Sequence, residues 1–276
     1  MCSGDILGSF AIVMATKRML IFGGNGYVGS TIARRALDVG WSVTCACRSG
    51  KPGHLRAEDY PDQLLPPPSP LFAPGGWVDK VDWMTVDALD RPSVYQAVQE
   101  SAADAVVTCI GVLTTDKKLG RQFNGDTNVN IAAAVYETPH VQRMVFVSAA
   151  RVPLASYFLR GYYEGKPMVE KAMRETLKGR AAILQPGFVY GTRFTSSGKG
   201  VPLWVVGKPL ECLMLPVYRL TGTLDPAIDV EDVARAAVQA SHFANMPLPD
   251  RAVVLKYDDM IAASRAFRPV DHSKIE

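Results

Sequence analysis

A glycine-rich turn near the start of the chain has the spacing that binds phosphate groups. Glycines at 23, 26 and 29 follow an apolar run at 19–22 and precede a segment with helical periodicity. In such a strand–turn–helix unit the glycines let the backbone approach a pyrophosphate, and the helix N-terminus offers it N–H groups. The turn therefore predicts a dinucleotide site. Its expected binding residues are Gly23, Gly24, Asn25, Gly26, Tyr27, Val28 and Gly29.

The residues that follow the next expected strand indicate which dinucleotide fits. An NAD(H) site usually places an acidic residue there to bind the ribose 2′-hydroxyl. This chain has Arg48, Ser49 and Lys51 instead. These side chains suit a 2′-phosphate, because all three donate hydrogen bonds and two carry positive charge. The sequence predicts NADP(H), with NAD(H) as the alternative.

The ends of the third and fourth expected strands should contribute to the same site. Asp87 and Ala88 follow the third strand, where the carboxylate can accept a hydrogen bond from an adenine amino group. Cys109, Ile110 and Gly111 end the fourth strand. We expect them to pass beneath the ribose and nicotinamide, since glycine allows a close backbone approach.

Strand-like runs alternate with helical segments along the chain. The expected strands are 19–22, 41–47, 81–86, 105–110, 144–148 and 181–184, and the clearest helices are 92–102, 128–137, 167–177 and 229–240. This alternation favours parallel strands with right-handed crossovers. It predicts an α/β fold, a doubly wound parallel sheet (Rossmann fold) with a small C-terminal substrate-side elaboration.

The chain length suits one nucleotide-binding domain rather than two. We expect a single domain over 18–258, with its substrate-side elaboration at about 187–228. An N-terminal arm is expected over 1–17 and an extended C-terminal tail over 259–276. A proline-dense surface loop is expected at 64–76, because prolines there exclude a helix or a central strand.

Composition narrows the possible partners. The 276 residues carry a formal net charge of +3 and 48% of them are hydrophobic, which is typical of a globule with a large core. No charged tail indicates a nucleic-acid partner. The five cysteines have neither zinc-site nor CxxC spacing, so we expect reduced thiols and no metal. No run reaches the ~18–20 apolar residues of a spanning helix, so any membrane contact would be peripheral.

With these motifs in place, the chain resembles the short-chain dehydrogenase/reductase superfamily, in its atypical, extended-like branch. The resemblance covers about residues 18–240 and includes the glycine turn, Asp87 and Gly111. Four further segments carry it, namely 146–149, 160–166, 185–191 and 228–234. It implies that Pro186, Gly187 and Phe188 contact the cofactor.

The same resemblance implies catalytic roles for three residues. Tyr162 would exchange a proton during hydride transfer, and Ser148 would orient the substrate carbonyl. Lys166 would hold the cofactor ribose and lower the pKa of Tyr162. Residues four apart on a helix share a face, so this cation can lie near the phenol.

Two departures from the superfamily pattern favour a protein that binds its cofactor but does not catalyse a reaction. Ala149 occupies the usual serine position, and Ser148, one residue earlier, is expected on the opposite face of the strand. Pro167 follows Lys166, where it disfavours the helical conformation of the preceding residue. We therefore expect a distorted Tyr162–Lys166 geometry.

The resemblance extends to organellar proteins linked to ubiquinone biosynthesis or to plastid lipid droplets. A more distant relative is the NADPH-carrying accessory subunit of respiratory complex I. The resemblance implies a mitochondrial protein peripheral to the inner membrane, or alternatively a plastid protein. Its partner would be a quinone or isoprenoid-like hydrophobic small molecule, or a membrane protein complex.

The apolar run 201–217 leaves three interpretations open. It could line an isoprenoid pocket, contact a membrane peripherally or lie buried in a larger complex. The leading functions are a slow NADP(H)-dependent reductase and a catalytically inactive, cofactor-stabilised subunit. A nucleotide-sugar epimerase is disfavoured, because the substrate region has no evident arginine-rich clamp for a diphosphate.

Overall fold

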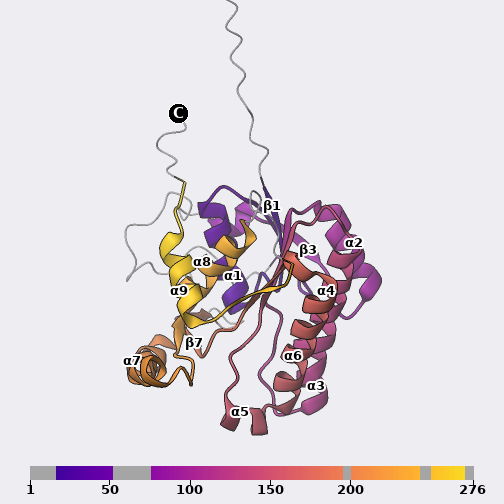
Figure 1. Cartoon of the computed structure of the whole chain (residues 1–276). Helices are drawn as coiled ribbons and strands as arrows, with labels where there is room; N and C mark the ends of the chain where they lie inside the picture. The colour runs from indigo at the N-terminus through magenta and orange to yellow at the C-terminus, as the bar shows by residue number, and fades with distance from the viewer. Residues whose placement is uncertain (1–16, 52–75, 195–199, 243–249, 271–276) are drawn as a thin grey trace, which may run out of the picture.

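The computed structural model describes residues 17–51, 76–194, 200–242 and 250–270 (Figure 1). Apart from their final residues, the arm expected at 1–17 and the proline-dense loop expected at 64–76 lie outside these ranges. The described residues form one large sheet with helices on both faces.

All neighbouring strands of the main sheet run parallel. Their order is β11-β6-β5-β4-β1-β2-β3. The strands are β1 (Arg18–Phe22), β2 (Ser42–Cys47), β3 (Asp82–Thr85), β4 (Ala105–Thr108), β5 (Arg143–Val147), β6 (Ala181–Leu184) and β11 (Val253–Leu255). The winding direction reverses between β1 and β4, and ligands of such folds bind at the carboxyl ends there. The predicted doubly wound fold is confirmed.

Helices connect and cover the strands. They are α1 (Tyr27–Asp38), α2 (Arg91–Ser101), α3 (Lys117–Arg121), the π-helical η4 (Gln122–Asp126), α4 (Thr127–Tyr136), α5 (Pro153–Phe158), α6 (Arg160–Thr176), α7 (Trp204–Thr221), α8 (Val230–Ser241) and α9 (Tyr257–Ala266). Two short 3-10 turns are η3 (Trp77–Lys80) and η5 (Lys178–Arg180).

The sheet is buried on both faces, which explains why its central strands are continuous apolar runs. One core cluster joins the sheet to α1, α8 and α9 and includes Ile32 and Met260. A second cluster joins the other face to α2, α4 and α6 and includes Ile131 and Met173. Figure 1 shows these two helical layers on opposite sides of the strands.

Helix α6 runs unbroken through Pro167, so Lys166 is helical although this proline was expected to disfavour that conformation. The reason is close packing on the opposite side of the helix. A Cβ atom at Gly161 would collide with the carbonyl of Lys117, and one at Gly165 would lie 2.8 Å from the amide of Gly125. Tertiary contact with α3 and η4 therefore holds the helical path, while Pro167 lies on the exposed face.

The chain beyond 250 also differs from the sequence prediction. The expected extended tail from 259 is wrong, because α9 continues to Ala266 and packs on α8. The preceding β11 adds a seventh strand beside β6. Tyr257 and Met260 are buried in the core cluster, so packing stabilises a segment whose own periodicity is weak.

The segment expected as a substrate-side elaboration contains α7 and two small sheets. Its strands are β7 (Val189–Tyr190), β8 (Thr192–Phe194), β9 (Gly200–Pro202) and β10 (Ile228–Asp229). Strand β7 pairs with β10, and β8 pairs with β9. Figure 1 shows α7 standing out from the lower edge of the molecule.

The described residues contain no membrane-spanning helix, no metal-binding cluster and no disulfide. None of their helices is long and apolar enough to cross a bilayer. They hold no cluster of three or more His, Cys, Asp or Glu arranged for a metal ion. Their cysteines at 45, 47, 109 and 212 are free thiols.

Candidate functional site

A cavity of about 720 Å³ lies at the carboxyl ends of β1 to β4. Of the predicted cofactor residues, it is lined by Gly23, Asn25, Gly26, Arg48, Ser49, Asp87, Ala88, Cys109, Ile110 and Gly111. The structure therefore brings together residues from four separate strand ends, as expected for the reversal point of a doubly wound sheet.

The glycine turn has the geometry that a pyrophosphate requires. Gly23 adopts a positive φ of 81°, and its carbonyl accepts a 2.9 Å hydrogen bond from the amide of Gly26. A Cβ atom at Gly29 would collide with the carbonyl of Gly23. No side chain caps α1, and its first turn has no acidic residue. The positive end of α1 therefore faces the cavity without a competing group, which fits a dinucleotide phosphate.

Three other residues of the turn support it rather than line the cavity. A Cβ atom at Gly24 would collide with Cys45 of β2, so this glycine lets the turn lie against the neighbouring strand. Val28 packs against the core. The buried hydroxyl of Tyr27 has no hydrogen-bond partner among the described residues and points toward Gly191, away from the turn.

The end of β2 carries the side chains predicted to bind a 2′-phosphate. The exposed guanidinium of Arg48 lies 4.9 Å from the ring centre of Phe123. Asn25 Nδ2 donates a 3.0 Å hydrogen bond to Ser49 Oγ, which joins the glycine turn to the β2 loop. Lys51 does not line the cavity, because its ammonium pairs with Asp79 at 2.6 Å on the surface.

The loop after β3 is fixed by its own backbone. The Asp87 carboxylate accepts a 3.0 Å bond from the amide of Leu89. Asn130 Nδ2 donates to the carbonyls of Ala88 and Leu89 at 3.1 and 3.3 Å. This loop is therefore a rigid wall of the cavity, with the Asp87 side chain exposed on it.

Lys166 and Tyr162 lie together at the β4 end of the site. Lys166 is only 5% exposed, and its Nζ donates to the carbonyl of Val147 at 2.8 Å. The same Nζ is 3.5 Å from the carbonyl of Ile110 and 5.7 Å from the ring centre of Tyr162. The expected pair is therefore present on one helical face, and Pro167 does not separate it.

The electrostatics of Tyr162 differ from the expectation. Burial raises the pKa of Tyr162, and the neighbouring Tyr163 raises it further. The predicted lowering of this pKa is therefore wrong, because removal of the phenol from water favours its neutral form. Tyr162 keeps its proton at neutral pH.

The buried Lys166 ammonium makes stability depend on alkaline pH. Burial lowers the pKa of Lys166 from 10.5 to about 8. Between these values the unfolded chain holds more protons at this site, so the free energy of unfolding rises with pH. The cost of the buried charge is full below about pH 8 and absent above about pH 10.5.

We expect this cost to disappear in Lys166→Met. From pH 7.5 to 10.5 the wild type should gain on the order of 3 kcal/mol of unfolding free energy relative to this variant. Urea unfolding at several pH values measures the difference. Parallel pH profiles of the two proteins would contradict the buried charge.

The structure adds Asn124, which the sequence analysis did not select. Its side-chain amide donates to the carbonyls of Val112 and Gly120 at 2.8 and 2.7 Å and accepts from the amide of Val112 at 3.1 Å. A Cβ atom at Gly111 would lie 2.7 Å from Asn124 Oδ1 and 3.4 Å from Lys166 Nζ. Asn124 lies in π-helical η4, and such bulges are frequent at functional sites.

A signal for this asparagine exists in the chain. Asn124 and Asn128 are four residues apart and fully buried, and the apolar residues Ile131, Ala132 and Val135 follow them on the buried side. Asn128 accepts from Thr108 at 2.6 Å and donates to the carbonyl of Ile110 at 3.3 Å. The two amides thus hold the loop after β4 in place.

The Ser148 hydroxyl is bound to a carboxylate of α6. Its Oγ donates a 2.6 Å hydrogen bond to Glu170, which also accepts from Gln185 at 2.9 Å. Glu170 follows Lys166 by one helical turn on α6, so Ser148 supports the helix. The substrate-orienting role of Ser148 stays a prediction.

The segment 186–188 does not line the cavity described above. A Cβ atom at Gly187 would collide with the carbonyl of Pro226, while Pro186 accepts from the amide of Ala150 at 2.7 Å. The Phe188 ring is 43% exposed. Cofactor contact by these residues stays a prediction. Other lining residues outside the prediction are Phe22, Ala46, Cys47, Val86, Val112, Leu119, Phe123 and Thr127.

The fold and the cavity together define an NAD(P)-binding protein of the Rossmann type. A model of the NAD dependent epimerase/dehydratase family matches residues 19–254, and the chain belongs to this family. An uncharacterized chloroplastic protein of Arabidopsis thaliana is 30% identical over 238 residues, covering 82% of this chain and 71% of that protein. MIOREX complex component 2 of Saccharomyces cerevisiae is 28% identical over 96 residues, covering 35% and 29% respectively.

Solved structures agree on the fold. The UDP-Glc/GlcNAc 4-epimerase of Campylobacter jejuni superposes with a TM-score of 0.57 at 17% identity, covering 89% of this chain and 82% of that chain. At this identity the likeness establishes the architecture alone. The cofactor class, NAD(P), follows from the family, and the uncapped α1 terminus fits it.

Proposed function

We propose that the protein is an NADP(H)-dependent reductase that acts on a hydrophobic carbonyl compound of the quinone class. The observation that carries the proposal is the position of Lys166 and Tyr162. Lys166 Nζ lies against the loop of Ile110 and Gly111, which lines the cofactor cavity, and Tyr162 is its neighbour on the same face of α6.

In the proposed reaction Tyr162 donates the proton and Lys166 stabilises the phenolate that remains. A bound dinucleotide would supply hydride to the carbonyl carbon. The Tyr162 O–H bond breaks, and its proton passes to the carbonyl oxygen, so a ketone gains one hydride and one proton. Because burial raises the pKa of Tyr162, the hydroxyl is protonated before the reaction. The Lys166 cation, 5.7 Å from the ring centre, then stabilises the phenolate.

The choice of NADP(H) is supported by the end of β2. Arg48 and Ser49 line the cavity, and the position usually taken by an acidic residue is basic. We expect Arg48→Ala to weaken NADPH binding about 10- to 100-fold, because a charge-assisted hydrogen bond to phosphate is lost. NADH affinity should stay within about twofold, and fluorescence titration of both dinucleotides measures the two values. An equal loss for both would assign Arg48 to another part of the cofactor.

A second function is favoured by one observation. The Ser148 hydroxyl donates its hydrogen bond to Glu170 rather than to a substrate, which suits a protein that binds its cofactor for stability alone. The discriminating experiment starts with release and mass identification of the nucleotide that co-purifies with the protein. Its redox state is then followed after addition of a short-chain ubiquinone analogue. Oxidation that depends on Tyr162 supports the reductase, while tightly held, unreacted NADPH supports an accessory subunit.

We also propose an organellar location. The chloroplastic relative from Arabidopsis thaliana supports a plastid, and the resemblance described for the sequence supports the periphery of the mitochondrial inner membrane. A C-terminal fluorescent fusion, imaged with plastid and mitochondrial markers in cells of the source organism, separates these locations. Diffuse signal outside both organelles would overturn the proposal.

A further inference from the structure

Helix α7 turns its polar groups toward the body of the protein. A Cβ atom at Gly207 would collide with the ring of Tyr190, so the helix lies directly against β7. The Glu211 carboxylate accepts hydrogen bonds from the hydroxyls of Tyr190 at 2.7 Å and Tyr257 at 2.9 Å. It also pairs with Lys208 at 2.7 Å. A carboxylate and two phenols therefore anchor the inner face.

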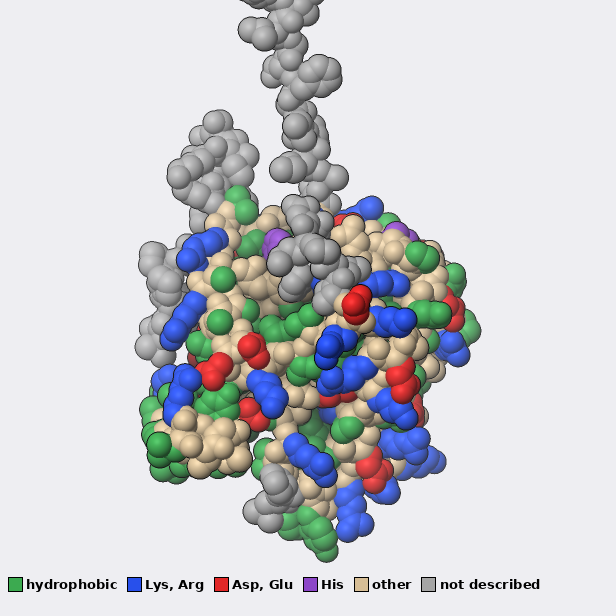
Figure 2. Space-filling model, viewed as in Figure 1, with side chains coloured by type: hydrophobic (Ala, Val, Ile, Leu, Met, Phe, Trp, Pro, Cys, Tyr) green, Lys and Arg blue, Asp and Glu red, His purple; other side chains and the backbone are tan. Residues whose placement is uncertain are grey.

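The outer face of the same helix is apolar along its 18 residues. At about 100° per residue, one side collects Val205, Val206, Pro209, Leu213, Pro216, Val217 and Leu220. Exposed fractions reach 87% at Leu220, 73% at Leu213 and 64% at Val206. Figure 2 shows this apolar group at the lower left of the molecule. An ordinary surface helix buries its apolar side and exposes its polar side, whereas α7 does the reverse. Packing within the described fold therefore does not explain the outer apolar side chains.

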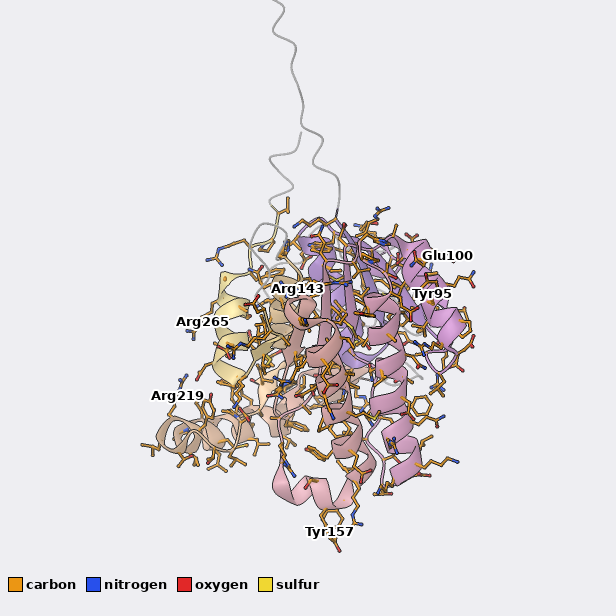
Figure 3. All side chains as sticks on the ribbon, turned by 45° about the vertical axis from the view of Figure 1, so that its right-hand side comes forward. Tyr95, Glu100, Arg143, Tyr157, Arg219 and Arg265 are labelled. Atoms are coloured by element: carbon orange, nitrogen blue, oxygen red, sulfur yellow. The ribbon has the colours of Figure 1, made fainter. Side chains whose placement is uncertain are left out.

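A second apolar projection lies at the same end of the molecule. Tyr157 and Phe158 of α5 are 67% and 61% exposed. Figures 1 and 3 place both α5 and α7 at the lower end, and Tyr157 points outward from it. The Arg160 guanidinium lies 5.1 Å from the ring centre of Tyr157. An exposed aromatic side chain beside a cation is typical of a membrane–water boundary.

Positive charge accompanies these apolar groups. Arg151 and Arg160 flank α5, and Arg193 lies in the β8–β9 hairpin that leads into α7. All three are exposed, and none forms a salt bridge with another described residue. The combination of apolar side chains and free cations matches a surface with an apolar interior and anionic headgroups.

We propose that this end of the protein docks on an anionic lipid bilayer, with the outer face of α7 and the tip of α5 in the headgroup region. A second copy of the chain fits less well, because a two-fold interface would bring the same arginines together. The two prolines inside α7 also favour a hydrated headgroup region over a dry protein interface. Pro209 and Pro216 cannot donate to the carbonyls of Val205 and Cys212, and these carbonyls need the water that a headgroup region supplies.

The docking proposal goes beyond the reductase proposal, and its test needs no turnover. Of the four tryptophans, Trp204 at the start of α7 is 44% exposed, whereas the other three pack in the core. We expect vesicles of phosphatidylglycerol and phosphatidylcholine with brominated acyl chains to quench Trp204 fluorescence. Phosphatidylcholine vesicles alone should quench it little at 0.15 M salt, and Trp204→Phe should remove the quenching.

Two double variants complete the experiment. Leu213→Ser with Leu220→Ser should lower vesicle binding at least about tenfold, because two exposed leucines no longer enter the bilayer. The matched control, Tyr95→Ser with Tyr136→Ser, removes exposed apolar side chains from α2 and α4 and should keep wild-type binding. Equal binding by both variants would overturn the proposal. So would light scattering that reveals a dimer which the leucine variant dissociates, since a second copy would then cover α7.

Discussion

Replacing Tyr162 by Phe should lower the rate of NADPH oxidation by about 10²- to 10⁴-fold, the range that a general acid contributes. The hydroxyl is the group that gives its proton to the substrate oxygen. Its loss leaves the ring and its contact with Lys166 in place, 5.7 Å from ring centre to Nζ. The dissociation constant of NADPH should therefore change less than about threefold, since the cavity lining is unaltered. Stopped-flow absorbance at the NADPH band and a binding titration measure both quantities.

The neighbouring tyrosine provides the control for this variant. Tyr163 packs edge to face on Tyr162 with ring centres 5.1 Å apart, but its side chain lies on a different face of α6. Tyr163→Phe should keep most of the activity. If both variants lose activity equally, the hydroxyl of Tyr162 is not the proton donor. If Tyr162→Phe keeps full activity with a substrate that the wild type reduces, the catalytic assignment is wrong.

Replacing Gly26 by Leu should abolish NADPH binding while the protein stays folded. Gly26 lines the cavity and is exposed, and it precedes the uncapped first turn of α1. A leucine side chain there occupies the space through which the backbone approaches the pyrophosphate. Loss of those backbone bonds should weaken binding by at least about 100-fold, since charged hydrogen bonds contribute most of the phosphate affinity. Calorimetric titration measures the loss, and the melting temperature of the cofactor-free protein checks the fold.

Replacement of Gly29, a second glycine of the same turn, should destabilise the fold, unlike replacement of Gly26. A Cβ atom at Gly29 would collide with the backbone carbonyl of Gly23 and approach Cys109 Sγ to 2.8 Å. Gly29→Val should therefore lower the melting temperature, because the helix must move away from β1. A Gly26→Leu protein that binds NADPH with wild-type affinity would overturn the assignment of the phosphate site.

The sequence predicted the cofactor site best where a residue type suited to binding directly follows a predicted strand. Gly23, Arg48, Asp87 and Gly111 each follow a strand of the main sheet, and parallel strands bring their carboxyl ends to one edge. Local pattern therefore predicted most of the cavity lining. The alternation of runs at 19–22 and onward also predicted the parallel sheet, because strands buried on both faces read as unbroken apolar segments.

The failures come from interactions between distant segments. Lys51 follows a strand end like Arg48, but Asp79, 28 residues away, pairs with it on the surface. Pro167 indicated that Lys166 would not be helical, yet the packing of Gly161 and Gly165 on the preceding helices maintains a helix there. The pKa of Tyr162 could not be derived from its spacing to Lys166, since burial of the phenol is a property of the whole fold.

The position of β11 has a consequence for biosynthesis. This strand, residues 253–255, pairs along β6, whose own residues are made about 70 positions earlier. Until β11 emerges from the ribosome, β6 is an edge strand with free backbone groups beside a fully apolar sequence. Edges of this kind recruit other chains. The nascent protein is therefore prone to intermolecular strand pairing at β6 in the interval between synthesis of β6 and synthesis of β11, and the shorter β11 then takes over the edge position.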